Sequence, residues 1–92
     1  MSPAGRYRVV PRTPFQTIAG ETIVMGSGAR RVYLLNETAT VVWQALREPC
    51  SADDLGRLLA RTYDVEAASA RSDARELLQG FLRQGLIEGV GP

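Results

Sequence analysis

The chain has 92 residues, of which 45% are hydrophobic, and this length suits one domain around a single core. It has no histidine and one cysteine, so neither a Ser-His nor a Cys-His nucleophile pair can be built, and no usual metal-ligand spacing is present. The sequence has no apolar run long enough to cross a membrane and no secretory leader, which predicts a cytoplasmic protein. We therefore expect neither an enzyme acting alone nor a bound cofactor or metal.

Charge is distributed unevenly along the chain. Residues 1–35 carry five arginines against one glutamate, a net charge of +4, whereas residues 36–92 carry six arginines against nine acidic residues, a net charge of −3. A basic N-terminal half would steer an acidic partner toward the protein. An ordinary solvated surface would show the same composition, and the sequence leaves both interpretations open.

The first 14 residues differ in composition from the rest of the chain. They contain Pro3, Pro11 and Pro14, and proline removes a backbone donor from any regular pairing. We expect this segment to be extended and partly mobile. The sequence thus predicts an N-terminal segment over residues 1–14 and a folded domain over residues 15–88.

Three short β-type runs begin the domain, and turn residues separate them. Ala19-Gly20 suits a tight hairpin turn, and Gly26-Ser27-Gly28 marks a second turn. Each run alternates its side chains between two faces, as strands do. The sequence therefore predicts a three-stranded antiparallel meander over residues 15–19, 21–25 and 30–35.

Three helices are predicted after the meander, and each has a recognisable end. Asn36 is a good N-cap, because its side-chain oxygen accepts a backbone N–H of the first turn, and Pro49 prevents that helix from continuing. Ser51 with Asp54 three residues later is a capping-box variant that starts the second helix. Gly85 is placed to end the third helix in the left-handed conformation. The first and third helices are predicted over residues 37–47 and 67–84.

Apolar residues recur at helical spacing in all three helices. Ala39, Val42, Trp43 and Leu46 follow one another at i, i+3, i+4 and i+7, which places them on one face. The second helix repeats the pattern as far as Thr62. The predicted core consists of Leu35, Val42, Trp43, Leu46, Leu55, Leu58, Leu59, Leu78, Phe81 and Leu86.

Gly80 lies inside the third predicted helix, where glycine costs roughly 1 kcal/mol relative to alanine. Close approach by a neighbouring helix or by a bound chain would explain a glycine at this position. A tolerated surface glycine is the third interpretation and the one that we favour.

Three helices and a small sheet are typical of winged helix-turn-helix proteins, so nucleic-acid binding is one hypothesis for function. Two features weigh against it. All predicted strands precede the helices, whereas the wing of the usual DNA-binding domain follows the recognition helix. The third helix, with the residue before it, balances three arginines with three acidic residues, and phosphate contact needs a cationic excess.

Peptide capture at a sheet edge is the competing hypothesis. An exposed edge strand presents unpaired backbone groups, and an extended peptide can pair with them as a further strand. The third predicted strand is well placed for this if the third helix packs beside it. Arg30 and Arg31 would otherwise only protect this edge against unwanted pairing, and dimerisation through the same edge is left open.

The sequence also resembles a known family over residues 15–88. The motifs that carry the resemblance are a strand-to-helix junction, two short segments around the second helix and the end of the third helix. These motifs read Val32-Tyr33-Leu34-Leu35-Asn36-Glu37-Thr38-Ala39, then Val42-Trp43, Ser51-Ala52-Asp53-Asp54-Leu55, Tyr63-Asp64-Val65, and Asp73 through Leu77-Leu78 to Gly85-Leu86-Ile87. They are similar to those of the PqqD-like proteins, which are peptide chaperones of pyrroloquinoline quinone biosynthesis, and of related RiPP recognition elements.

The resemblance implies a non-catalytic adaptor that binds the leader region of a ribosomally synthesised precursor peptide by β-strand addition. It implies a second partner, a modifying enzyme such as a radical-SAM maturase or a leader peptidase with its cyclase, and no nucleic-acid or membrane partner. A winged-helix nucleic-acid regulator and a structural subunit of a larger enzyme remain the alternatives. Carried over by position, the peptide contacts fall on Arg30, Arg31, Val32, Tyr33 and Leu34 of the third strand and on Arg71, Asp73, Ala74, Leu77 and Leu78 of the third helix.

Overall fold

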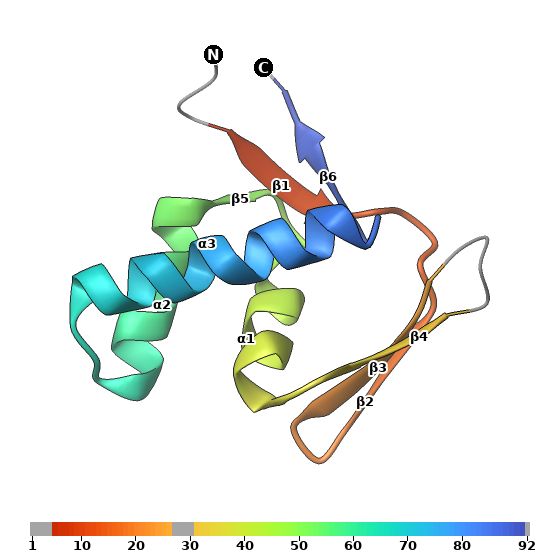
Figure 1. Cartoon of the computed structure of the whole chain (residues 1–92), viewed down its shortest axis with the longest axis horizontal. Helices are drawn as coiled ribbons and strands as arrows, with labels where there is room; N and C mark the ends of the chain where they lie inside the picture. The colour runs from red at the N-terminus through yellow and green to blue at the C-terminus, as the bar shows by residue number, and fades with distance from the viewer. Residues whose placement is uncertain (1–4, 27–30, 92) are drawn as a thin grey trace.

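The computed structural model describes residues 5–26 and 31–91. Within these residues, the chain forms three helices and two antiparallel three-stranded sheets (Figure 1). This mixed α+β class with three helices confirms the sequence prediction at that level. The strands are β1 (Arg6–Val9), β2 (Phe15–Ile18), β3 (Glu21–Met25), β4 (Val32–Leu35), β5 (Cys50–Ser51) and β6 (Ile87–Val90), and the helices are α1 (Glu37–Ala45), α2 (Ala52–Tyr63) and α3 (Ala67–Arg83).

The predicted meander is present as the sheet β2-β3-β4. Ala19 and Gly20 join β2 to β3 with φ angles of 52° and 83°, and two central residues with positive φ match the right-handed twist of a hairpin. Strand β4 begins at Val32. The second predicted turn lies largely outside the described residues, as does Arg30.

A second sheet, with strand order β5-β1-β6, was not predicted. Arg6 pairs with Val90 and Val9 pairs with Ile87. Strand β1, near the start of the described chain, therefore lies beside β6, near its end. The expectation of three strands, all before the helices, was therefore wrong. The sequence signal was weak because β1 has four residues, β5 has two, and the partners of β1 lie far away along the chain.

Local capping signals define the helix ends, as predicted. The backbone N–H of Ala39 donates to Asn36 Oδ1 at 2.9 Å and begins α1. Ser51 and Asp54 form both bonds of a capping box, at 3.0 and 3.1 Å, at the start of α2. Gly85 adopts φ 73° after α3, and the N–H of the next residue, Leu86, then donates to the carbonyl of Phe81.

The core surrounds Trp43, which lies in the last turn of α1 and is fully buried. Nine of the ten predicted core residues are buried, and the exception, Leu58, is half-buried. Thr62 is exposed. Leu58 and Thr62 are more exposed than predicted because α2 crosses α3 at Gly56, where an added Cβ would lie 3.1 Å from the Arg71 Cα. This close crossing turns Gly56 toward the core in place of Leu58.

Candidate functional site

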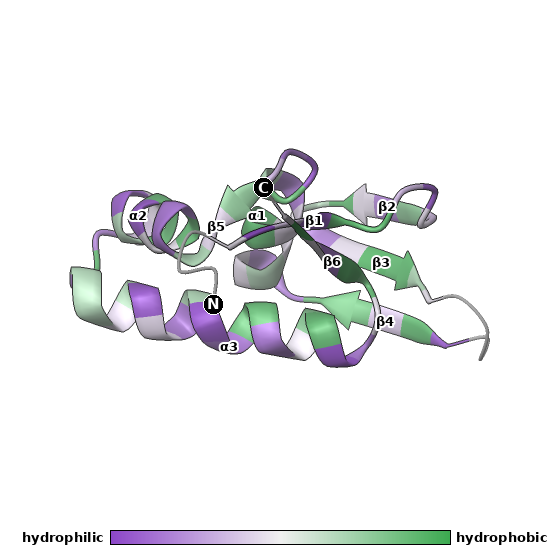
Figure 2. Ribbon diagram, turned by 90° about the horizontal axis from the view of Figure 1, so that it is seen from above, coloured by the Kyte–Doolittle hydropathy of each residue, from purple (hydrophilic) through white to green (hydrophobic). Residues whose placement is uncertain are grey.

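Strand β4 forms one edge of its sheet. It pairs with β3 through the register Thr22 with Leu35 and Met25 with Val32, and no strand in the described parts of the chain pairs with its other side. Seen from above, β4 is the strand of this sheet on the side of the molecule where α3 runs (Figure 2). An edge of this kind presents backbone N–H and C=O groups that an added strand can use.

The side chains of β4 alternate between two environments. Tyr33 is half-buried and packs against the core, and Leu35 is buried. Val32 and Leu34 point the opposite way and are 55% and 76% exposed. Arg31, which precedes the strand, is also exposed. Four of the five predicted strand contacts therefore lie at or beside a free edge, and the fifth, Arg30, lies outside the described residues.

Two of the predicted helix contacts are core residues. Ala74 is 0% exposed and Leu78 is 4% exposed, and they pack in the core with Ala70 and Phe81. These four residues lie on the face of α3 that the helix turns inward. Both side chains are covered by the core in this structure, and their contact with a bound peptide stays a prediction.

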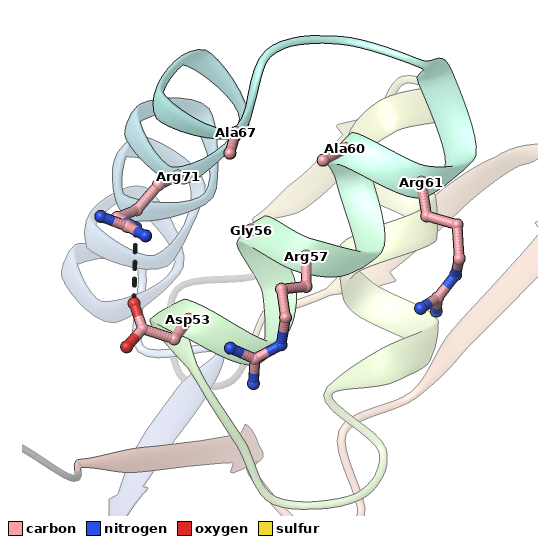
Figure 3. A pocket seen from close by; sticks show the side chains of 7 residues that line it. All are labelled: Asp53, Gly56, Arg57, Ala60, Arg61, Ala67 and Arg71. Atoms are coloured by element: carbon pink, nitrogen blue, oxygen red, sulfur yellow. Dashed lines mark ion pairs between the residues drawn. The ribbon is translucent and has the colours of Figure 1, made fainter.

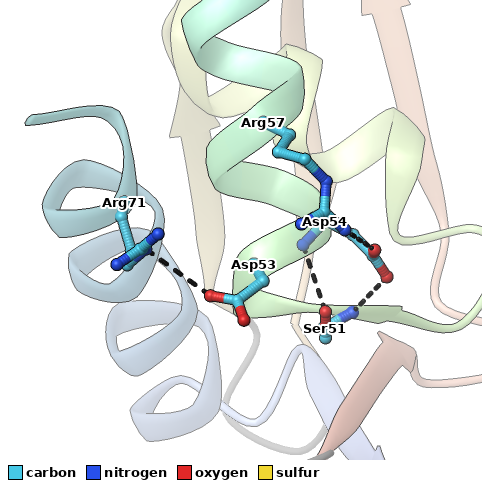
Figure 4. Close-up of polar contacts among 5 residues, drawn as sticks. All are labelled: Ser51, Asp53, Asp54, Arg57 and Arg71. Atoms are coloured by element: carbon cyan, nitrogen blue, oxygen red, sulfur yellow. Dashed lines mark hydrogen bonds and ion pairs between the residues drawn. The ribbon is translucent and has the colours of Figure 1, made fainter. Parts of the chain in front are cut away.

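Arg71 lies on the side of α3 that faces α2. Its Nε is 3.5 Å from Asp53 Oδ1 (Figure 4). Both residues line a hollow of about 420 Å³ between the two helices, together with Arg57 and Arg61 (Figure 3). Because Arg57 pairs with Asp54 at 2.8 Å, two of these three arginines are already neutralised by a carboxylate. Of these arginines, Arg71 links α3 to α2, and no residue of β4 lines the hollow.

A different flank of α3 carries Asp73, Leu77 and Gly80, which are spaced four and three residues apart. Arg71 and Gly80 lie on roughly opposite sides of the helix, because nine residues at about 100° each make two and a half turns. Leu77 is half-buried and packs against the core, as Tyr33 does from β4. Asp73 is exposed.

Gly80 lies outside the predicted set of peptide contacts, although it shares a flank of α3 with Leu77. A Cβ added at Gly80 would meet no atom within 4 Å, so no element of the described chain requires a glycine there. This removes close approach by a neighbouring helix as the explanation. The signal that could have found this position is its spacing of three residues from Leu77 on the same flank.

Cys50 does not have the environment of a nucleophile. Burial raises the pKa of its thiol, the carboxylates of Asp54 and Glu48 raise this pKa further, and Arg6 lowers it. Its Sγ donates to the carbonyl of Ala45 at 3.2 Å. The group is therefore a protonated thiol at neutral pH that packs between α1 and α2.

Residues 5–26 and 31–91 contain neither a metal site nor a membrane-spanning helix. No three His, Cys, Asp or Glu side chains in these ranges are grouped so that they could hold a metal ion. None of the three helices is both long and apolar enough to cross a membrane. The free edge of β4 and its surroundings thus remain the feature to explain.

The family model of coenzyme PQQ synthesis protein D (PqqD) matches residues 21–87. The chain belongs to the PqqD family. The matched segment runs from β3 to the first residue of β6, so it contains both the β4 edge and the whole of α3. Strands β1 and β2 lie outside it. A comparison of the sequence with curated proteins gave no match.

Three solved structures share this fold at low sequence identity. TbiB1 in complex with the TbiA(beta) leader peptide has a TM-score of 0.81 and 16% identity, over 92% of this chain and 99% of TbiB1. Lasso peptide synthetase B1 complexed with its leader peptide has a TM-score of 0.77 and 22% identity, over 89% and 96% of the two chains. The PqqD part of Methylobacterium extorquens PqqCD, described as a functional, stand-alone RiPP recognition element, has a TM-score of 0.72 and 16% identity, over 90% and 88%.

Proposed function

We propose that this PqqD-family protein is a non-catalytic adaptor that binds the leader region of a ribosomally synthesised precursor peptide and presents it to a modifying enzyme. The observation that carries the proposal is the free edge of β4, which lies within the segment matched by the family model. The likeness to two proteins solved with leader peptides supports the same function. The leader would add to β4 as a fourth strand of the sheet.

Backbone hydrogen bonds to β4 would supply sequence-independent affinity in this arrangement. Side chains of an added strand alternate between the two faces of the sheet. Those on the inner face would contact the half-buried Tyr33 and Leu77, and Gly80 would leave room for the chain to approach α3. Those on the outer face would lie beside Val32 and Leu34. We therefore expect a leader with apolar residues at alternate positions.

We infer that any preference for an acidic leader arises near Arg31. The positive charge of the first 35 residues is divided between the two sheets, because Arg6 and Arg8 belong to β1 and not to the sheet of β4. Arg8 is also paired with Glu88 at 2.9 Å. Arg31 precedes the binding strand and is exposed. A charge at that position would speed encounter with an acidic segment more than it would hold the complex together.

We further propose that the recognition domain comprises residues 15–88 together with β1, which pairs with β5 and β6 in the second sheet. We also propose that helices α1 to α3 with β2 to β4 are arranged in the winged helix-turn-helix manner. We propose in addition that the enzyme partner is a modifying enzyme such as a radical-SAM maturase or a leader peptidase with its cyclase. We propose a cytoplasmic location for the protein. The nucleic-acid alternative is weakened at one of the three arginines of α3, because Arg71 is paired with Asp53.

The test is calorimetry of the purified chain with the leader region of the short precursor peptide encoded beside its gene. Binding at micromolar concentration or tighter supports the proposal, and NMR shifts of the β4 amides should report on the added strand. Absence of binding at high micromolar concentration would contradict the proposal, and so would tight binding to duplex DNA.

A further inference from the structure

The outer face of the β2-β3-β4 sheet carries a contiguous apolar surface. Thr22, Val24 and Leu35 of this sheet point into the core, so the alternate residues point away from it. Seven large hydrophobic side chains are exposed in the described residues, and five of them lie on this outer face. We call these five the outer-face patch: Ile18, Ile23, Met25, Val32 and Leu34, which are 58%, 41%, 53%, 55% and 76% exposed.

The strand register makes the patch continuous. Ile23 lies directly opposite Leu34, and Met25 lies directly opposite Val32. Figure 2 shows hydrophobic colour along both β3 and β4. The largest apolar patch on the surface of a monomeric protein is often a functional surface.

A hollow of about 470 Å³ lies at one end of the patch, beside the β2-β3 turn. Ile18, Ile23 and Leu34 line it, together with Glu21 and Asn36. Its volume falls within the range of about 300–1,000 Å³ that is usual for binding sites. An apolar side chain that protrudes from a partner would fill this hollow, and a basic group beside it would face Glu21.

We propose that the outer-face patch is the docking surface for the modifying enzyme that acts on the bound precursor peptide. This inference rests on the proposed function. Val32 and Leu34 belong to the patch and also to β4, the strand that would receive the leader. A leader added beside β4 extends the sheet by one strand, and its outward side chains then continue the same face. An enzyme on this face would contact adaptor and peptide together.

The size of the patch favours this occupant over a second copy of the chain. Five partly exposed side chains of this kind cover on the order of 500 Å², whereas a stable interface takes about 800 Å² from each partner. A symmetric dimer through the patch alone would therefore be weak. The bound leader supplies the missing area, so enzyme and leader should each strengthen the binding of the other by the same factor.

The test uses the full chain, a synthetic leader peptide and the purified modifying enzyme encoded beside the same precursor. Ile18→Thr and Ile23→Thr together keep two β-branched residues, and therefore the strands, while removing apolar surface from the hollow. Val65→Thr is the matched control, because Val65 is 44% exposed outside the sheet, after α2. Circular dichroism and melting curves establish that each variant is folded.

The expected result is a loss of enzyme affinity on the order of tenfold in the double variant, with leader affinity unchanged and the Val65→Thr variant like the parent. In the parent, saturating leader should raise enzyme affinity. Enzyme binding that the double variant retains in full would overturn the inference, and so would an enzyme that fails to bind a parent chain that binds leader. If the parent chain is a dimer, and the double variant is a monomer that keeps its affinity for the enzyme, the patch belongs to the contact with a second copy. If the parent chain does not bind leader peptide in calorimetry with leader alone, the proposed function itself is contradicted.

Discussion

The ring of Trp43 meets the ring of Phe81 edge to face, with centroids 5.6 Å apart and planes at 80°. Phe15 meets the same indole in the same manner, at 5.5 Å and 81°. The three rings therefore connect β2 with α3 through α1. Because β4 is held in the sheet of β2, Trp43 sets the position of the β4 edge relative to α3, and so the geometry of the proposed peptide site.

Replacing Trp43 by alanine should lower the free energy of unfolding by about 3–5 kcal/mol, because the change opens a large cavity at the centre of the core. Chemical denaturation followed by circular dichroism measures this loss. Trp43→Phe should cost less, since it keeps an aromatic ring and removes the indole N–H, which is buried without a hydrogen-bond partner. A Trp43→Ala variant nearly as stable as the parent would show that the ring does not fill the core.

Leu77→Asp should weaken leader binding mainly by raising the dissociation rate, because it places a charge in the apolar surface that the peptide covers. Surface plasmon resonance with immobilised leader measures both rates. Leu82→Asp is the matched control, since Leu82 is 40% exposed on the same helix but lies away from the flank of Leu77 and Gly80. Equal effects of the two substitutions would mean that Leu77 has no special place in the site.

Arg31→Glu should lower the rate constant for association of the leader peptide. Reversing a charge at the edge of the site slows association with an acidic leader and reduces its salt dependence, while dissociation changes little. Association rates measured between low and high salt check this expectation. A leader whose association is independent of salt in the parent would remove Arg31 from the recognition mechanism.

Gly80→Ala should have opposite effects on stability and on binding. The new Cβ meets nothing within 4 Å, so the helix gains roughly 0.5–1 kcal/mol of stability from the better propensity of alanine. Leader affinity should fall, and it should fall further in Gly80→Leu, because the side chain occupies the space of the peptide. Melting curves and calorimetry separate the two effects. Unchanged affinity in both variants would identify Gly80 as a tolerated surface glycine.

Asp54 gives the stability of the protein a defined acid dependence. The backbone N–H of Ser51 lowers the pKa of this carboxyl, and the Ser51 side chain and Arg57 lower it further. The stabilisation is therefore complete above the ordinary aspartate pKa of about 3.9 and is lost as pH falls through the lower pKa of the folded state. Asp54→Asn should be less stable than the parent at pH 7, and the difference should shrink as pH falls below about 4. A difference that stays constant with pH would contradict this role.

The sequence by itself determined the features that depend on neighbouring residues. Asn36, Ser51 and Gly85 mark helix ends because each acts on backbone groups within one turn of itself. The Ala19-Gly20 turn and the alternation on either side of it determined the meander in the same way. Apolar spacing then identified which face of α1 is buried, since 3.6-residue periodicity is a property of one helix.

Only the tertiary structure decided which segments meet. The pairing of Arg6 with Val90 needs contact between the two ends of the described chain, and no local turn links these two strands as Ala19-Gly20 links β2 to β3. The crossing at Gly56 rotated α2 and α3 so that Arg71 faces Asp53 and Ala74 enters the core. Periodicity gives the faces of each helix, but the rotation of one helix against another depends on close packing of side chains that are distant in sequence.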